Sequence, residues 1–191
     1  MSIDVGEESF DALAEYAGVP MTVMVDRVLD VALVDGGLGG MALTERGLDV
    51  PYVKDYDAVE GEGPSRWAKR FDMSNWGLIT ARRQGVMVGG AVIAFDTDGV
   101  NMLEGRSDLA VVWDIRVREA NRGKGIGSAV FGCVEGWARA RGCLHLKVET
   151  QNINVPACRF YARMGCTLGA IDLFAYPDLP EETQLLWYKE L

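Results

Sequence analysis

The sequence predicts a single α/β domain, and two patterns support this fold class. Between residues 109 and 165, β-rich apolar runs alternate with apolar residues at helical spacing. Before residue 109, pairs of β-rich runs are joined by glycine-containing turns, which is typical of hairpins. With 191 residues, of which 49% are hydrophobic, the chain can bury one core and does not require a second domain.

The N-terminal part is expected to consist mainly of hairpins. A short helix is expected at 10–16, strands at 21–34 and 41–50, an acidic loop at 55–63, a helix at 64–71, and hairpin strands at 77–83 and 86–95. The acidic loop contains Asp55, Asp57, Glu60 and Glu62, set beside Tyr52 and Tyr56. These acids favour a cationic ligand over nucleic acid.

The central part is expected to be strand, helix, strand, helix. A strand at 109–117 precedes a helix from Ser128 to Arg141, which Gly142 ends. A strand at 143–150 then places Leu144, Leu146 and Val148 on one face and His145, Lys147 and Glu149 on the other. A second helix begins near Asn154 and stops at Gly165, and strands at 166–174 and 183–188 complete the chain.

A glycine-rich turn joins the first of these strands to its helix. It reads Arg122-Gly123-Lys124-Gly125-Ile126-Gly127-Ser128. Glycines let the backbone approach an anion, and the first turn of a helix offers unpaired N–H groups at the positive end of its dipole. The turn therefore indicates a phosphate site, although an ordinary tight turn has the same composition.

Two spaced motifs resemble the GNAT N-acetyltransferase superfamily. They are Arg122-x-x-Gly125-x-Gly127, and Asn154-x-x-Ala157-x-x-x-Tyr161 followed by Met164-Gly165. The resemblance implies an α/β fold with a central mixed, mostly antiparallel sheet of about seven strands, flanked by helices and splayed between the fourth and fifth core strands, near Val117 and Thr150. It also implies transfer of acetyl from acetyl-CoA to an amine, with 1–108 on the substrate side, 109–165 as the acetyl-CoA-binding core and 166–191 as C-terminal strands.

The same resemblance implies which residues hold the cofactor. The backbone of Ile115, Arg116 and Val117 would pair with the pantetheine arm, and that of Arg122, Gly123, Lys124, Gly125, Ile126, Gly127 and Ser128 would hold the pyrophosphate. Asn154, Ala157 and Tyr161 complete the set.

A narrower resemblance points to the streptothricin (nourseothricin) acetyltransferase branch. It rests on the segments 51–57, 149–152, 157–161 and 169–172, together with Tyr176. It implies that a small cationic amine is bound by Tyr52, Asp55, Tyr56, Asp57, Asp172 and Tyr176. Apart from the resemblance, Trp113 or Trp76 is a candidate to pack on the cation, although a tryptophan is more often buried in the core. Other small amines, amino acids, and protein termini or lysines remain open as acceptors.

Three residues are candidates for the chemistry of transfer. Tyr161 is expected to protonate the departing sulfur, because a phenol with a reference pKa of about 10 is protonated at neutral pH. Its place in the apolar stripe of a helix is also that of a core tyrosine. Glu149 is the first candidate for the base that deprotonates the ammonium and Asp114 the second, although either carboxylate could instead hold the substrate or form an ion pair.

Composition excludes several other classes. The single histidine, His145, rules out histidine-rich metal sites, and the four cysteines contain no C-x-x-C pair, so neither zinc nor disulfides are expected. No apolar stretch is long enough to span a membrane and no signal peptide is visible, so a cytoplasmic protein that binds no membrane is expected. A homodimer is left open.

Charge divides the chain unevenly. Residues 111–165 carry nine Lys and Arg against four acids, a net of +5, so the remainder carries −9 − 5 = −14. A basic segment suits an anionic cofactor, and an acidic remainder attracts cations and repels nucleic acid.

Two alternatives use the same residues. Gly123-x-Gly125-x-x-Ser128 nearly fits a dinucleotide-binding fingerprint, with Glu149 at the end of the following strand. A dinucleotide-binding domain should contain further parallel β-α units, whereas the chain before residue 109 has hairpins. A non-catalytic acetyl-CoA sensor would keep the same cofactor residues.

Overall fold

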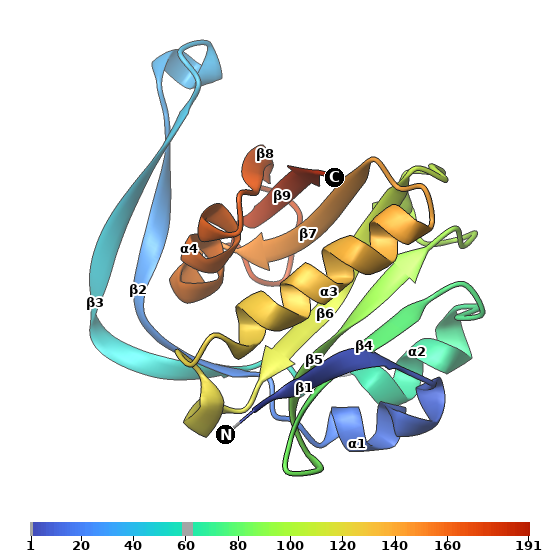
Figure 1. Cartoon of the computed structure of the whole chain (residues 1–191). Coiled ribbons are helices and arrows are strands. Elements are labelled where there is room, and N and C mark those ends of the chain that lie inside the picture. Colours follow the sequence, from blue (N-terminus) through green and yellow to red (C-terminus); the bar gives the residue numbers. More distant parts are fainter. Residues whose placement is uncertain (1, 59–62) are drawn as a thin grey trace. The chain divides into compact units, whose positions relative to one another are not determined.

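The computed structural model describes residues 2–58 and 63–191, which form two compact units (Figure 1). Unit 1 consists of Met1–Thr22, Asp55–Val148 and Lys189–Leu191, and unit 2 of Val23–Lys54 and Glu149–Tyr188. Each unit is a set of segments distant in sequence, so both depend on long-range contacts. The expectation that the whole chain is one domain stays a prediction.

Seven strands are hydrogen-bonded into one sheet in the order β1-β4-β5-β6-β7-β9-β8. Their bounds are β1 Asp4–Glu8, β4 Gly77–Arg83, β5 Val86–Phe95, β6 Leu109–Val117, β7 His145–Gln151, β8 Thr167–Asp172 and β9 Gln184–Glu190. The pairs β1–β4, β4–β5, β5–β6 and β8–β9 are antiparallel, and β6–β7 is parallel. The predicted α/β class with a mostly antiparallel sheet of seven strands is confirmed.

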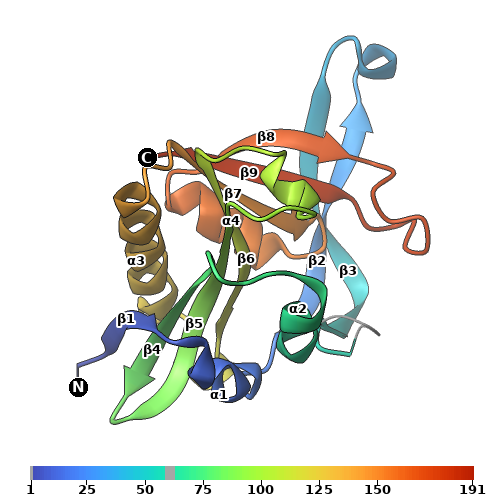
Figure 2. The ribbon, with the colours of Figure 1, turned by 90° about the vertical axis from the view of Figure 1, so that its right-hand side faces the viewer.

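Helices cover both faces of β4, β5 and β6 within unit 1 (Figure 2). Helix α3 (Ile126–Ala140) lies on one face and buries a stripe at helical spacing: Ile126, Val130, Phe131, Val134, Trp137 and Ala138. On the other face lie α1 (Leu13–Ala17) and α2 (Pro64–Arg70), whose buried Tyr16 and Trp67 join a core cluster with Leu78 and Val92. Because both faces are covered, β5 is continuously apolar and β4 is buried from Gly77 to Ala81.

A bulge interrupts β6 near its C-terminal end. Val92 of β5 pairs with Asp114 and Ile93 pairs with Val112, so Trp113 has no partner on β5. A bulge of this kind breaks the alternation of side chains between the two faces. As a result Trp113 packs against the core cluster that contains Tyr16, and the adjacent Asp114 contacts Tyr16 itself.

The parallel pairing of β6 with β7 is short. It runs from Leu109↔His145 to Val112↔Val148, whereas the pairing of β6 with β5 continues to Val117. The backbone of β6 beyond Val112 therefore extends past its register with β7. The sheet was predicted to open between its fourth and fifth strands, which are β6 and β7 in the observed order.

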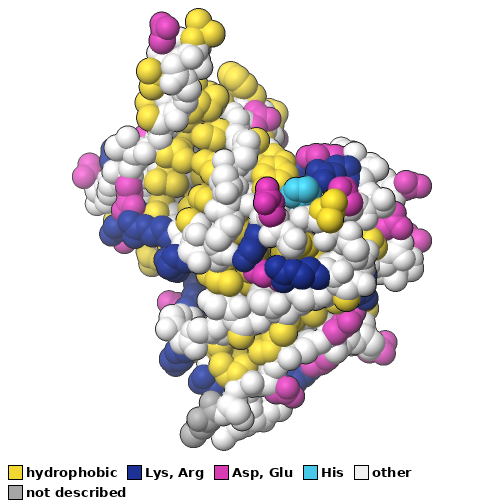
Figure 3. Space-filling view, turned by 45° about the horizontal axis from the view of Figure 1, so that its top comes forward, with side chains coloured by type: hydrophobic (Ala, Val, Ile, Leu, Met, Phe, Trp, Pro, Cys, Tyr) yellow, Lys and Arg dark blue, Asp and Glu magenta, His cyan; other side chains and the backbone are white. Residues whose placement is uncertain are grey.

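Unit 2 contains a second, two-stranded sheet made of β2 (Thr22–Leu33) and β3 (Met41–Asp55). Val25 and Val28 of β2 pack with Ile153 and Leu48 in a small core. The far end of this hairpin is exposed and apolar, as Figure 3 shows for its surface, and its exposed residues include Leu33, Val34, Leu38 and Met41. Helix α4 (Val155–Arg163) belongs to the same unit, and its Arg159 forms an ion pair with Glu45 of β3.

Several boundaries differ from the sequence-based expectation. Strand β1 was not expected, because a five-residue strand whose residues are exposed or half-buried has little periodicity to detect. Helix α3 begins two residues earlier than expected, at Ile126, and β3 continues to Asp55. Of the expected acidic loop, Glu60 and Glu62 lie outside the described residues.

One residue of the expected polar face of strand β7 is buried. Lys147, expected on the polar face with His145, is buried and bonds Glu104 at 2.6 Å. A lysine is tolerated there because the Glu104 carboxylate and the Met102 carbonyl accept hydrogen bonds from its ammonium group. His145 is half-buried and lies 3.1 Å from Arg106, and Figure 3 shows this single histidine among charged side chains.

All four cysteines are free thiols, and three of them, Cys143, Cys158 and Cys166, are buried. Among the described residues, no helix is both long and apolar enough to cross a membrane.

Candidate active site

The glycine-rich turn of unit 1 forms an open start to helix α3. Gly123 and Gly125 have φ values of 72° and 79°, which favour glycine, and a Cβ at either would meet no atom within 4 Å. Gly125 is the N-cap of α3 and no side chain caps this end. The first-turn N–H groups are therefore presented by an exposed backbone, as the sequence predicts for an anion site.

Two cations flank this turn and both donate to backbone carbonyls of unit 1. Arg122 donates to the carbonyls of Val117 and Thr22 at 2.9 and 2.8 Å. Lys124 donates to the Ala120 carbonyl at 2.7 Å. Because these acceptors are uncharged, the bonds fix both cations near the turn, and no carboxylate among the described residues compensates their positive charge.

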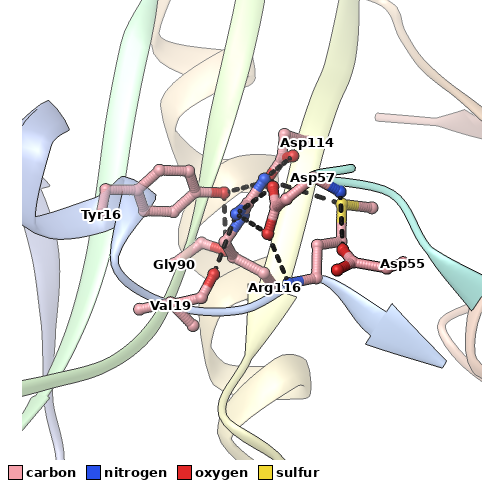
Figure 4. Close-up of polar contacts among 8 residues, drawn as sticks. Tyr16, Val19, Asp55, Asp57, Gly90, Asp114 and Arg116 are labelled. Carbon is pink, nitrogen blue, oxygen red and sulfur yellow. Dashed lines mark hydrogen bonds and ion pairs between the residues drawn. The ribbon is translucent and has the colours of Figure 1, made fainter. Parts of the chain in front are cut away.

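A buried polar cluster in unit 1 contains three of the predicted site residues (Figure 4). The guanidinium of Arg116 donates to both oxygens of Asp114, at 2.8 and 2.6 Å. It also donates to Asp57 at 3.0 Å and to the Val19 carbonyl at 2.9 Å. Tyr16 donates its hydroxyl proton to Asp114.

Protonation in this cluster follows from burial and charge. Burial, and then the charge of Asp114, raises the pKa of Tyr16 well above its ordinary value, so this phenol stays protonated as a donor. Burial acts to lower the pKa of Arg116, but its hydrogen bonds and charge interaction with Asp114 outweigh burial and raise it. Asp114 therefore forms the ion pair that the sequence left open as an alternative to a catalytic base.

The acidic segment that follows β3 is attached to this cluster. Asp57 accepts from Arg116 and, at 2.9 Å, from the Met21 N–H, and about a third of its side chain is exposed. Asp55 accepts from the Asp57 N–H at 3.0 Å, and the Tyr56 N–H donates to the Met21 carbonyl. The segment is thus held by backbone bonds, with the Asp57 carboxylate partly open to solvent.

Trp113 lies in an aromatic cluster of unit 1. Its ring centroid is 5.2 Å from that of Phe71 and 5.3 Å from that of Trp76. Edge and tilted contacts of this kind stabilise a core. Trp113 is only half-buried, so its role toward a cationic substrate stays a prediction.

Unit 2 brings together two other predicted site residues, Glu149 and Tyr176. Tyr176 donates its hydroxyl proton to Glu149 Oε1 at 2.6 Å. Gln184 donates to Glu149 Oε2 at 2.7 Å, and Gln151 donates to the Tyr176 oxygen at 3.0 Å. The separation of 27 residues between Glu149 and Tyr176 gave no local signal for this contact, and only the resemblance placed both residues in one site.

The second motif forms helix α4 in unit 2. Asn154 caps this helix by accepting from the Ala157 N–H at 3.2 Å, so the Asn-x-x-Ala spacing has a structural use here. Tyr161 is buried and packs against Phe160 with ring centroids 5.3 Å apart. Burial raises the pKa of the Cys158 thiol, one turn before Tyr161, to about 12.

The remaining predicted substrate residues, Tyr52 and Asp172, also lie in unit 2. Asp172 accepts from the Phe174 N–H at 2.8 Å, which fixes a turn after β8. Tyr52 is 41% exposed, and burial followed by the charges of Glu182 and Glu181 raises its pKa. Glu182 is itself paired with Lys54 at 2.5 Å.

Sequence reasoning missed Tyr16 and Gln184. Tyr16 lies in a short helix far from either motif, and 98 residues separate it from Asp114. Gln184 begins β9, and an isolated glutamine on a strand carries no pattern that indicates its partner. Only the folded chain reveals the two contacts.

Comparison with known proteins decides the family. A model of the acetyltransferase (GNAT) family matches residues 49–166. This chain belongs to the GNAT acetyltransferase family. The matched GNAT region contains both the glycine-rich turn and the Asn154 to Tyr161 motif, so the predicted family is confirmed.

Individual relatives agree with the narrower resemblance. A streptothricin acetyltransferase from Escherichia coli is 44% identical over 85 residues, which are 43% of this GNAT chain and 49% of that protein. The aligned region thus spans about half the length of this curated relative. A crystal structure of a nourseothricin acetyltransferase is 25% identical, with a TM-score of 0.77, and the match covers 100% of this chain and 99% of the other.

A further GNAT-fold neighbour comes from Bacillus anthracis and was solved in complex with acetyl coenzyme A. It is 22% identical, has a TM-score of 0.76 and is matched over 100% of both chains. At this identity the likeness supports the fold.

Proposed function

We propose that this chain is an acetyl-CoA-dependent N-acetyltransferase whose acceptor is a primary amine of a small cationic molecule, attacking the thioester directly. The observation that carries the proposal is the GNAT family match, which covers both the glycine-rich turn and the helix of Tyr161. The streptothricin and nourseothricin acetyltransferases among its relatives support a streptothricin-like antibiotic as acceptor.

The residues at the start of α3 fit an anionic cofactor. The exposed backbone at Gly123 and Gly125, the uncapped helix end and the fixed cations Arg122 and Lys124 suit a pyrophosphate. When bound, acetyl-CoA supplies the acetyl thioester. The backbone of Ile115 to Val117 would hold its pantetheine arm, because β6 continues past its register with β7.

Two side chains of unit 2 are assigned to proton transfer. The hydroxyl of Tyr161 would donate its proton to the departing sulfur. The carboxylate of Glu149 would bind the ammonium group of the acceptor and take its proton. Asp114 remains the second choice, because both of its oxygens already accept from Arg116.

The acceptor would be held through its positive charge. Asp57 offers a partly exposed carboxylate, and Glu149 offers a half-buried one. Tyr52, Asp55, Tyr56, Trp113, Asp172 and Tyr176 remain proposed substrate residues. A cationic amine is favoured because carboxylates near an acceptor raise its local concentration.

The decisive experiment combines binding and turnover. Purified protein is titrated with acetyl-CoA by calorimetry, and thiol release is followed with streptothricin, polyamines, amino acids and lysine peptides. We expect acetyl-CoA binding and streptothricin-dependent thiol release. Thiol release only with lysine peptides would show that the acceptor is a protein lysine and not a small cationic amine. Tight CoA binding without turnover for any amine would contradict the proposed acetyltransferase activity.

The assembly and location are also proposals. We propose a cytoplasmic, single-domain protein that binds neither nucleic acid nor membranes, and a homodimer remains open as its assembly. Light scattering coupled to size-exclusion chromatography distinguishes a homodimer from a monomer, whose mass would be close to the 20.9 kDa of one chain.

A further inference from the structure

A chain of hydrogen bonds in unit 2 ends on both oxygens of Glu149. Gln151 donates to the Tyr176 oxygen at 3.0 Å, and Tyr176 donates to Glu149 Oε1 at 2.6 Å. Gln184 of β9 donates to Glu149 Oε2 at 2.7 Å. The carboxylate is therefore oriented from two sides, by residues of β9 and of the segment between β8 and β9.

The direction of this chain is fixed by its ends. A side-chain amide nitrogen only donates and an ionised carboxylate only accepts. Because Gln151 donates to the Tyr176 oxygen, the single hydroxyl proton of Tyr176 points to Glu149. Burial, and then the charge of Glu149, raises the pKa of Tyr176, so the phenol remains a neutral donor.

The partners of Glu149 differ from those of other shielded carboxylates. Asp114 is paired with Arg116, and Glu182 with Lys54. Within the described part of the chain, the polar partners of Glu149 are the neutral Tyr176 and Gln184. Its negative charge is therefore uncompensated. Each carboxylate oxygen also retains a lone pair that can accept from an N–H group.

We propose that Gln184 is a positioning residue that, with Tyr176, holds Glu149 as an uncompensated carboxylate for binding the ammonium group of the acceptor. This inference rests on the proposed function and names a determinant of its specificity. Both donors must be neutral in this arrangement, since a cation at position 184 would pair with the negative charge of Glu149 that is to bind the acceptor.

Two substitutions at Gln184, each with a side chain about as long as that of glutamine, distinguish a positioning role from a merely structural one. Gln184→Met removes the donor, whereas Gln184→Lys keeps a donor to Glu149 and adds a positive charge. Asp178→Asn is the matched control, because it makes the same change in net charge at an exposed residue of the segment that carries Tyr176. Thermal unfolding and calorimetric acetyl-CoA binding establish that each variant is folded.

Steady-state kinetics with acetyl-CoA and streptothricin provide the test. We expect the KM for streptothricin to rise about tenfold in Gln184→Met, the size of one lost hydrogen bond to a charged group, and further in Gln184→Lys. The dissociation constant of acetyl-CoA should change less than about twofold in both, and Asp178→Asn should retain the wild-type KM.

The possible failures are distinguishable. An active wild type with a Gln184→Lys variant that keeps the wild-type KM would overturn the inference alone, because a retained donor would then suffice. A rise in KM equal to that of Asp178→Asn would also overturn it. A wild type that binds streptothricin but transfers no acetyl would overturn the proposed function, and calorimetric binding of streptothricin to the same variants would still test the inference. A wild type that neither binds nor acetylates streptothricin would overturn both.

Discussion

The carboxylate of Asp114 and the guanidinium of Arg116 are joined by two hydrogen bonds, 2.8 and 2.6 Å long, in the interior of unit 1. Only 1% of the Arg116 side chain and 6% of the Asp114 side chain are exposed. The two residues are neighbours on one face of β6, so the strand itself sets their geometry. The pair connects β6 to Val19 and to Asp57.

Breaking this pair is expected to destabilise the protein strongly. Asp114→Asn leaves the buried Arg116 without its closest counter-charge, and the expected loss is about 3–5 kcal/mol in the free energy of unfolding. Urea denaturation measures it. Asp26→Asn removes one of the two acidic partners of the partly exposed Arg27, the other being Glu45, and should change stability by less than about 1 kcal/mol. Equal effects of the two substitutions would contradict the buried role.

Acid should destabilise unit 1 through Glu8. Hydrogen bonds from Arg82 and then Thr80 lower the pKa of Glu8 from 4.5 to about 2. The unfolded chain therefore binds a proton that the folded chain does not, so this contribution is complete above pH 4.5 and is lost as the pH falls toward 2. Between these values, the melting temperature of the wild type should fall more steeply than that of Glu8→Gln. Parallel curves would rule out this cause.

A side chain at Gly125 should destabilise the turn before α3. Its φ of 79° is strained for alanine, so Gly125→Ala should lower stability by about 1–2 kcal/mol and weaken acetyl-CoA binding. Gly136 lies in the exposed middle of the same helix with room for a Cβ. Gly136→Ala should raise stability by about 0.5–1 kcal/mol and leave binding unchanged. Calorimetry and urea denaturation of both variants would show whether this contrast holds.

Removal of the Tyr161 hydroxyl should affect turnover more than cofactor binding. If the phenol protonates the departing sulfur, Tyr161→Phe should lower kcat by about 100-fold or more, with little change in the dissociation constant of acetyl-CoA. Single-turnover kinetics and calorimetry separate the two quantities. A variant with wild-type kcat would remove Tyr161 from the chemistry, and one that loses acetyl-CoA binding would indicate a structural role.

Cys158 should resist alkylation in the folded protein. Burial raises the pKa of its thiol to about 12, so the thiolate fraction at pH 8 is negligible. Mass spectrometry after iodoacetamide treatment should find Cys158 unmodified in buffer and modified in urea. The half-buried Cys133 serves as the comparison. Rapid modification of Cys158 in buffer would indicate that α4 opens locally.

Local patterns account for most of the predictable structure. Strands β4, β5 and β6 have the bounds expected from their apolar runs, since these strands are buried on both faces. The glycine-rich turn and the α4 cap were visible because a left-handed residue and an N-cap each restrict residue type at a fixed position. β1 and the burial of Lys147 were not predictable, because each depends on a distant partner.

The sequence by itself determined the family, the class of fold and the position of the turn that suits a phosphate group, because these depend on residues close together in the chain. The tertiary structure alone decided how each candidate carboxylate is used. It paired Asp114 with a buried cation and gave Glu149 two neutral donors, one of them 35 residues away. The physical reason is that the charge state and orientation of a carboxylate depend on whatever side chains folding brings to within hydrogen-bond distance, and sequence spacing does not encode that distance.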